Sequence, residues 1–107
     1  MPECIVILAT FSTREEAHTI SQILLEEKVV ACANIIDNIS SHFWWQGAIE
    51  GAREVLLITK TEKALFKQVE SIIKKKHSYE VPEIIALPII EGHEHYVNWI
   101  HESVQHE

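Results

Sequence analysis

The stretch HSYEVPEIIALPIIEGHEHYVNWI, residues 77–100, joins a polar loop, an apolar run interrupted by proline and the start of a last helix. Residues 84–90 have the usual length of a buried strand. Loops beside rigid strands often hold functional side chains. Five polar residues stand at the mouth of this strand: His77, Ser78, Tyr79, Glu80 and Glu83. They indicate either a site or an ordinary, solvated helix-to-strand loop.

The chain before this stretch begins with a strand pattern and a helix pattern. Residues 4–9 are continuously apolar, which predicts a strand buried on both faces. Ser12 and Glu15 have the spacing of a capping box, so we expect Ser12 to cap a helix that runs to about Lys28. A second strand is predicted over residues 29–45.

Turn signals divide the middle of the chain. Asp37-Asn38 suits a bulge or bend within the second strand. Gln46-Gly47 supplies a turn into a third strand at residues 49–60. Thr61 is the expected cap of a second helix. The apolar positions of that helix have helical spacing and should face inward: Leu65, Val69, Ile72 and Ile73.

A fourth strand at residues 83–90 and a helix after Gly92 complete the order βαββαβ plus a C-terminal helix. This order predicts an α+β, ferredoxin-like sandwich, formed as one domain over residues 1–107. In such a sheet the first and third strands are central, and the second and fourth lie at the edges. Pro82 and Pro88 agree with an edge position for the fourth strand, because proline cannot donate to a central ladder.

Composition narrows the function classes. The 107 residues include 9 basic and 16 acidic side chains, for a net charge of −7. A chain this acidic is not expected to bind nucleic acid, which normally requires a basic surface. It carries no signal peptide, lipidation motif or twenty-residue apolar span, so we expect no membrane partner and a cytoplasmic location. The two cysteines should then be reduced thiols.

The aliphatic strands also predict an oligomer. Two crossover helices cover one face of a four-stranded sheet, whereas continuous apolar runs require cover on both faces. The short terminal helix cannot hide a whole face. We therefore expect an obligate oligomer whose sheets pack against one another.

Several motifs together resemble one family. HSYEVPEIIALP, followed by Gly92, Tyr96 and Trp99, is similar to the signature of the CutA family, the divalent-cation tolerance proteins. Three further stretches resemble that family's strands and hairpin: EEKVVACANI, FWWQG, and EVLLI with the following Lys60-Thr61. The resemblance covers nearly the whole chain.

The resemblance implies a homotrimer with the architecture of the PII-like signalling proteins. Its three sheets would face inward, and the long hairpin would extend pairing to a neighbouring subunit. It also implies a role in tolerance to copper and other divalent metals, with copper binding in some members and no obligatory cofactor.

The resemblance carries over only part of a copper site. Members proposed to bind copper use a cysteine in the first strand and a histidine pair before the tyrosine of the motif. Here these positions hold Ala9 and Lys76-His77. His77 would therefore need further ligands, for which we expect Cys32 and Glu80, with Glu83 or a neighbouring subunit as other sources.

Other histidines admit a metal interpretation and a simpler one. His93 and His95 form a short metal-like array, yet residues two apart on a helix diverge, which favours a solvated helix start. His101 and His106 fall on a polar tail.

A second interpretation places a small-molecule site in the clefts between subunits. The expected lining combines aromatic, cationic and acidic side chains: Trp45, Lys60, Thr61, Tyr79 and Glu83. The simpler alternatives are interface packing for the tryptophans and a salt bridge for Lys60.

An enzyme is the least supported class. An acylphosphatase on this topology would need an arginine cradle and an amide, and only Arg14 and Arg53 are available as arginines. The sequence also contains no P-loop or G-x-S-x-G motif. We therefore expect a non-enzymatic protein.

Overall fold

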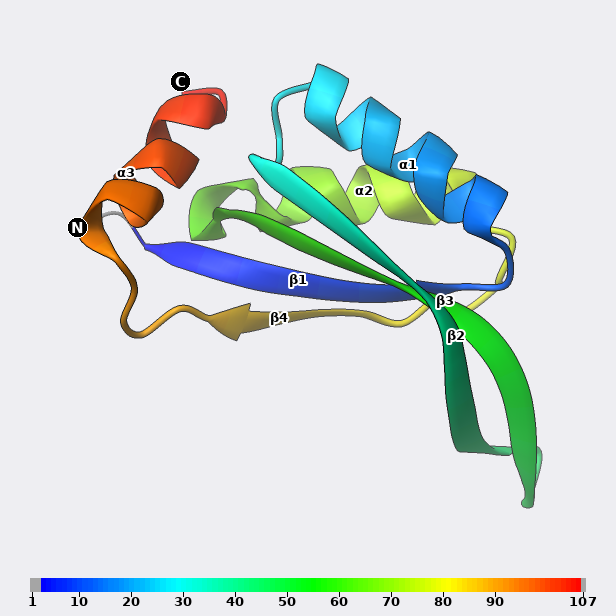
Figure 1. Cartoon of the computed structure of the whole chain (residues 1–107). Helices are drawn as coiled ribbons and strands as arrows, with labels where there is room; N and C mark the ends of the chain where they lie inside the picture. Colours follow the sequence, from blue (N-terminus) through cyan, green and yellow to red (C-terminus); the bar gives the residue numbers. More distant parts are fainter. Residues whose placement is uncertain (1–2, 107) are drawn as a thin grey trace.

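Four strands form one antiparallel sheet in the order β2-β3-β1-β4 (Figure 1). The computed structural model describes residues 3–106, so Met1, Pro2 and Glu107 lie outside the described residues. Its elements are β1 (Cys4–Phe11), α1 (Arg14–Glu26), β2 (Cys32–Trp45), β3 (Ala48–Glu62), the short 3-10 helix η1 (Lys63–Leu65), α2 (Phe66–Lys76), β4 (Ile84–Pro88) and α3 (Glu94–Ser103). The ferredoxin-like order is confirmed, with the first and third strands central and the others at the edges.

The main core lies between the sheet and the helices α1 and α2. Every second residue of β1, from Ile5 to Phe11, faces these helices and is buried. Leu57 of β3 does the same from the neighbouring strand. The helices contribute the apolar stripes that their sequences predict: Ala17, Ile20 and Leu24 from α1, and Val69 and Ile73 from α2.

The opposite face of the sheet is largely uncovered. Figure 1 shows α1 and α2 on one side of the sheet, and α3 beside one end of it. Pairing among β1, β3 and β4 places six aliphatic residues of these strands on the uncovered face, hereafter the open face: Val6, Leu8, Leu56, Ile58, Ile85 and Leu87. Ile85 and Leu87 are 48% and 50% exposed. Its far end is covered, where Val97 and Ile100 of α3 pack on Cys4.

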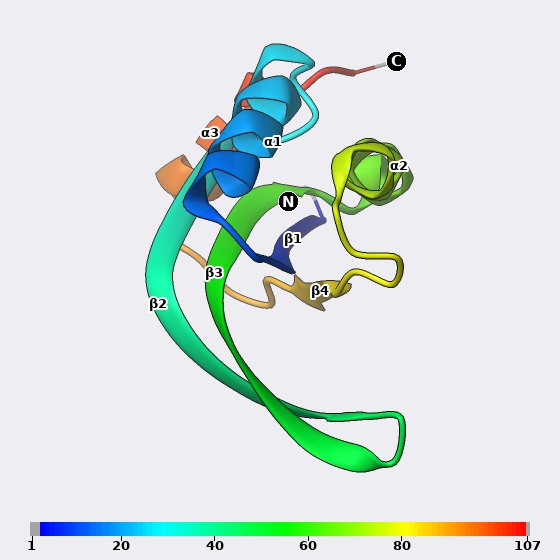
Figure 2. The ribbon, with the colours of Figure 1, turned by 90° about the vertical axis from the view of Figure 1, so that its right-hand side faces the viewer.

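The hairpin formed by β2 and β3 extends well beyond the other strands. It curls away from the helices toward the side of β4 (Figure 2). The predicted bulge is present between Ile36 and Ile39, where Asn38 has a φ of 60°. The predicted turn is also present, with a φ of 50° at Gln46 and 82° at Gly47, as a tight hairpin turn requires. The hairpin tip carries exposed apolar side chains, since Trp44 is 73% exposed.

The predicted cap of α1 is wrong by one residue. β1 continues to Phe11, so the helix begins later than the capping-box spacing suggested. Thr13 occupies the N-cap, where its hydroxyl accepts a hydrogen bond of 3.2 Å from the backbone N–H of Glu16. The helix also ends at Glu26 rather than near Lys28, because Lys28 takes a φ of 57° and starts the turn toward β2.

The predicted cap of the second helix is also wrong. Thr61 belongs to β3, is fully buried, and donates from its hydroxyl to the carbonyl of Val29 at 2.6 Å. The chain then passes through η1 before α2 begins at Phe66. At the other edge, β4 is shorter than the predicted strand 83–90, since it begins at Ile84 and ends at Pro88. No helix within residues 3–106 has the length and apolar character needed to cross a membrane.

Replacing Thr13 by Ala should lower the free energy of unfolding by about 1 kcal/mol, because one N–H at the helix start loses its acceptor. Ser12→Ala is the matched control and should change it by less than about 0.5 kcal/mol. Chemical denaturation of both variants at one protein concentration measures the difference. A larger loss in Ser12→Ala would restore Ser12 as the cap.

Candidate functional site

His77 fixes the polar loop between α2 and β4 to the end of β1. Its side chain is fully buried and stacks on Phe11 with ring centroids 4.5 Å apart. Its Nδ1 accepts a hydrogen bond of 2.9 Å from the backbone N–H of Tyr79. Its Nε2 therefore carries the proton and donates to the carbonyl of Thr10 at 2.7 Å. Both ring nitrogens are used inside the protein.

Glu16 holds the next residue of the same loop. Its two carboxylate oxygens accept hydrogen bonds of 3.1 Å from the backbone N–H and the hydroxyl of Ser78. Because Glu16 lies in the first turn of α1, the loop is fastened to both the helix layer and the sheet. Two of the five polar residues at the strand mouth, His77 and Ser78, thus form a structural clamp.

Tyr79 faces the hairpin and meets a carboxylate there. Its hydroxyl donates to Glu54 Oε2 at 2.8 Å. Burial raises the pKa of Tyr79 to about 12, with further contributions from the hydrogen bond and negative charge of Glu54 and from the charge of Glu16. Tyr79 is therefore a neutral hydrogen-bond donor at physiological pH and cannot act as a base.

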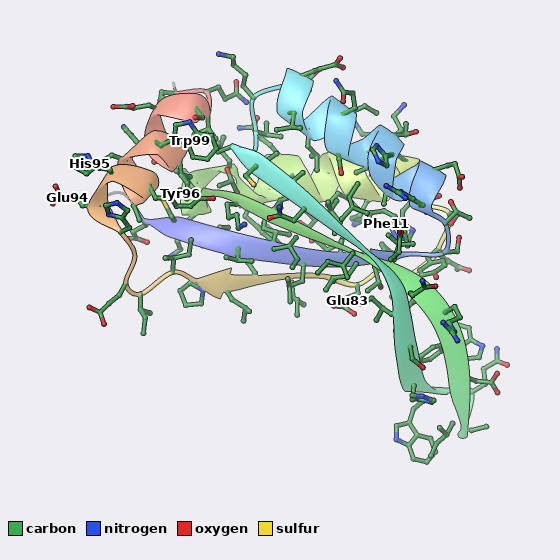
Figure 3. All side chains as sticks on the ribbon, in the orientation of Figure 1. Phe11, Glu83, Glu94, His95, Tyr96 and Trp99 are labelled. Atoms are coloured by element: carbon green, nitrogen blue, oxygen red, sulfur yellow. The ribbon has the colours of Figure 1, made fainter. Side chains whose placement is uncertain are left out.

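A cleft of about 740 Å³ lies between this loop and the hairpin. Its lining includes aromatic and aliphatic side chains and four glutamates: Phe43, Trp45, Tyr79, Val81, Glu50, Glu54, Glu80 and Glu83. No lysine or arginine is among the lining residues. Four carboxylates beside aromatic rings repel anions and attract cations, to which an aromatic face adds a further attraction. Figure 3 shows Glu83, one of these carboxylates, at the sheet.

The structure brings together three of the five residues predicted for a ligand cleft. Trp45, Tyr79 and Glu83 line the cleft, whereas Lys60 and Thr61 do not. Lys60 lies six residues from Glu54 along β3, or roughly 20 Å at the usual strand rise. Its ammonium group donates to Asn34 Oδ1 at 2.6 Å instead of pairing with a carboxylate. The cation expected in the cleft is therefore absent from it.

The residues predicted as metal ligands do not converge within one chain. His77 offers no free nitrogen, and Glu80 is an exposed residue of the cleft. Cys32 pairs with Lys60 toward the other end of the sheet, and its sulfur lies 3.6 Å from Asn34 Oδ1.

Strand pairing shows how far Cys32 lies from His77. Lys60 is the partner of Val6, four residues along β1 from the Thr10 carbonyl that His77 contacts, or roughly 13 Å. The predicted ligand set of His77, Cys32 and Glu80 is not a site in the chain by itself.

The second cysteine is no better a ligand. Cys4 is 3% exposed, and its burial, with the nearby negative charge of Glu62, raises the pKa of the thiol. A thiol that stays protonated is a poor metal ligand and a poor nucleophile.

A different group of metal-ligating side chains does converge among residues 3–106. It consists of Glu62, His101 and His106, whose ligand atoms all lie within 4.8 Å of one another. This group has no local signal in the sequence, because about forty positions separate Glu62 from the histidines. Only the return of α3 to the end of β3 brings them together. The other histidine pair, His93 and His95, has ring centroids 5.6 Å apart at the start of α3.

The raised pKa of Tyr79 gives a pH-dependent prediction. In Tyr96→Phe, Tyr79 is the only tyrosine left, and its ionisation, followed by tyrosinate absorbance, should have a midpoint near 12. Since the folded state favours the neutral form, its contribution to stability is complete below about 10 and is lost as the pH rises through the folded-state value. Adding Glu54→Gln should lower the midpoint. A midpoint near 10 in the folded protein would contradict the Tyr79–Glu54 contact.

Comparison with known proteins identifies the family. The family model of the CutA1 divalent ion tolerance protein matches residues 5–103. The divalent-cation tolerance protein CutA of Thermus thermophilus is 41% identical over 98 residues, which cover 92% of this chain and 95% of that protein. The CutA protein of Archaeoglobus fulgidus is 43% identical over 99 residues, covering 92% and 96%.

Solved structures agree with these sequence matches. The crystal structure of CutA1 from Oryza sativa has a TM-score of 0.95 at 35% identity, and the match covers 99% of this chain and 97% of that one. The structure of the Archaeoglobus protein, described as a periplasmic divalent cation tolerance protein, has a TM-score of 0.92 at 42% identity, covering 95% and 99%. The Thermus and Archaeoglobus relatives are named for tolerance to divalent cations, which is the non-enzymatic role expected from the sequence. The chain belongs to the CutA1 divalent ion tolerance protein family.

Proposed function

We propose that this chain acts in divalent-cation tolerance as a homotrimer that binds metal ions directly. The observation that carries the assembly is the open face, whose aliphatic residues lie on all three strands β1, β3 and β4. Soluble monomers rarely expose contiguous apolar surface of more than a few hundred Å². A second layer made by other copies of the chain would bury this surface.

The hairpin favours a ring over a two-fold dimer. It projects beyond β1 and β4 (Figure 2). Trp44 and Ile49 near its turn are exposed. An arm that binds a different surface on the next copy makes a head-to-tail contact, and such contacts form a closed ring when the rotation between copies closes. Three copies is the number that the resemblance to the family implies.

The metal part of the proposal rests on charge and on donor chemistry. The net charge of −7 attracts cations to the whole surface. Seven histidines supply imidazole nitrogens, which suit copper, zinc and nickel, and the family is one of divalent ion tolerance. Copper is thus a candidate ion, although the expected ligand His77 is committed to the clamp.

A small-molecule role for the acidic cleft is the second candidate. The cleft shares its side of the sheet with the open face, since Thr10 and Glu54 are on that side by strand alternation. A trimer would place it near the boundary between copies. Its carboxylates do not form a converging ligand group, and its aromatic wall suits an organic cation better than a bare ion. This favours a cationic effector and disfavours a phosphate-bearing one.

The cytoplasmic location remains a prediction. Among the relatives whose names state a compartment, the Archaeoglobus protein is described as periplasmic.

The assembly is tested by solution mass. Light scattering at micromolar concentration should give three times the chain mass of 12.3 kDa. Ile85→Glu and Leu87→Glu should lower that mass, because each buries a charge in the proposed interface. Leu25→Glu is the matched control, since Leu25 is also partly exposed but lies on α1. A wild-type monomer would reject the assembly.

The cleft is tested with tetramethylammonium as a probe and tryptophan fluorescence as the signal. Tyr79→Phe should weaken binding several-fold without a change in oligomer mass, because Glu54 loses the hydroxyl that orients it. Inorganic phosphate should not bind. Trp44→Phe should keep the signal, whereas Trp45→Phe should remove it. Equal affinity in wild type and Tyr79→Phe would reject the cleft as the ligand site.

A further inference from the structure

Glu62, His101 and His106 meet at the end of β3 from three separate segments. Glu62 is the last residue of the strand, His101 is in the last turn of α3, and His106 follows the helix. His101 Nδ1 contacts Glu62 Oε2, and His106 Nδ1 lies 3.9 Å from Glu62 Oε1. The two imidazole rings are 4.2 Å apart. One carboxylate and two imidazole nitrogens thus face a common point.

The Glu62 carboxylate has no competing structural task. Glu62 stands at the N-cap of η1 but makes no side-chain capping bond there. The adjacent cation, Lys63, points to Glu3 at 3.6 Å. Only 13% of the Glu62 side chain is exposed, whereas His101 and His106 are 47% and 44% exposed. The group therefore has a shielded negative charge at its base and an opening to solvent for entering ions and their bound water.

His106 is held with one nitrogen ready for a metal ion. Its Nε2 lies 2.6 Å from the carbonyl of His101, and a carbonyl can only accept, so Nε2 carries the proton. In a neutral imidazole the lone pair then lies on Nδ1, which faces Glu62. Proteins commonly orient metal-ligating histidines by such a bond from the other ring nitrogen to a backbone carbonyl.

The tail that carries His106 is itself fastened to the body of the protein. The backbone N–H of Gln105 donates to the carbonyl of Lys28 at 2.8 Å. Its side-chain amide donates to Gln68 Oε1 of α2 at 2.7 Å. Val104, one residue earlier, is 4% exposed. These contacts fix the position of the second histidine before any ion binds.

We propose that Glu62, His101 and His106 form a binding site for a divalent transition-metal ion, with one carboxylate oxygen and two Nδ1 atoms as ligands. On binding, the His101–Glu62 hydrogen bond opens, the ion takes the place of the proton on Nδ1, and a neutral His101 carries its proton on Nε2. Water fills the remaining positions. The biological role of this site rests on the proposed function, whereas its location rests on the geometry of these three residues.

The donor set also sets the metal preference. Imidazole nitrogens suit copper, nickel and zinc, and affinity for a given nitrogen and oxygen site is greatest for Cu²⁺ among the divalent first-row ions. Mg²⁺ and Ca²⁺ prefer oxygen ligands and should not compete. The site should therefore bind Cu²⁺ more tightly than Zn²⁺, and neither ion should be displaced by excess Mg²⁺.

Calorimetric titration of the full-length protein with Cu²⁺ and with Zn²⁺, each against a competing chelator, tests the site. Wild type should bind one ion per chain. His101→Ala, His106→Ala and Glu62→Gln should each weaken it at least about tenfold, the loss that even a missing outer-shell partner can cause. His95→Ala is the matched control, because His95 is on the same helix and projects away from the body (Figure 3). Circular dichroism checks that each variant is folded.

Nuclear magnetic resonance of the histidine ring nitrogens gives a readout independent of the variants. Zn²⁺ should shift the Nδ1 signals of His101 and His106 and leave those of His77 and His95 in place. A stoichiometric site that survives in all three variants, or is lost in His95→Ala, would overturn this assignment and leave direct metal binding standing. A wild-type protein with no stoichiometric site would overturn both this site and the proposed direct metal binding. The solution mass would still test the trimer separately.

Discussion

A central strand that is apolar on both faces, in a chain whose helices cover only one of them, is the constraint on which the rest of this structure depends. β1 pairs with β3 along Cys4–Phe11 and with β4 along Ile5–Ala9, so most of its backbone groups have strand partners. Its alternate residues then face either the helix layer or the open face. The first set is closed by α1 and α2. The second set, which includes Val6 and Leu8, requires cover that the chain does not supply.

The other large features lie around that open face. The hairpin curls to its side, and the clamp made by His77 and Glu16 fixes the loop that forms the opposite wall of the acidic cleft. The clamp positions this loop through polar groups. Tyr79, which burial and Glu54 keep neutral, adds a hydrogen bond from the loop to the hairpin inside the cleft. Polar residues that suggest a catalytic or metal site in the sequence thus serve mainly to position the wall of the cleft.

The C-terminal segment supplies two residues of the proposed metal site. α3 covers the far end of the open face through Val97 and Ile100, and this packing returns the chain to the end of β3. The tail then binds to Lys28 and Gln68, which leaves His101 and His106 beside Glu62. The metal-ligand group is therefore a by-product of the way the last helix covers the sheet, at the end of the sheet away from the acidic cleft.

Much of the fold could be predicted from the sequence, because its signals are local. Apolar runs, the bulge at Asp37-Asn38 and the turn at Gln46-Gly47 each depend on neighbours a few positions away. Proline at Pro88 indicated an edge strand for the same reason. Caps were less predictable: Thr13 and Ser12 are both good caps, and only the length of β1 decides between them. Thr61 has the chemistry of a cap but is buried in a strand by a partner far away in sequence.

The sites depend on contacts between distant segments and could be predicted only in part. The sequence by itself determined the donors, namely which residues carry imidazole, carboxylate or thiol groups, and it grouped Trp45, Tyr79 and Glu83, which line one cleft of the chain. It could not show that both nitrogens of His77 are consumed, that Lys60 turns to Asn34, or that Glu62 meets two histidines. A hydrogen bond or a ligand group depends on distances of a few Å between segments tens of residues apart. Only strand register and helix packing determine those distances, so the tertiary structure decided which donors meet.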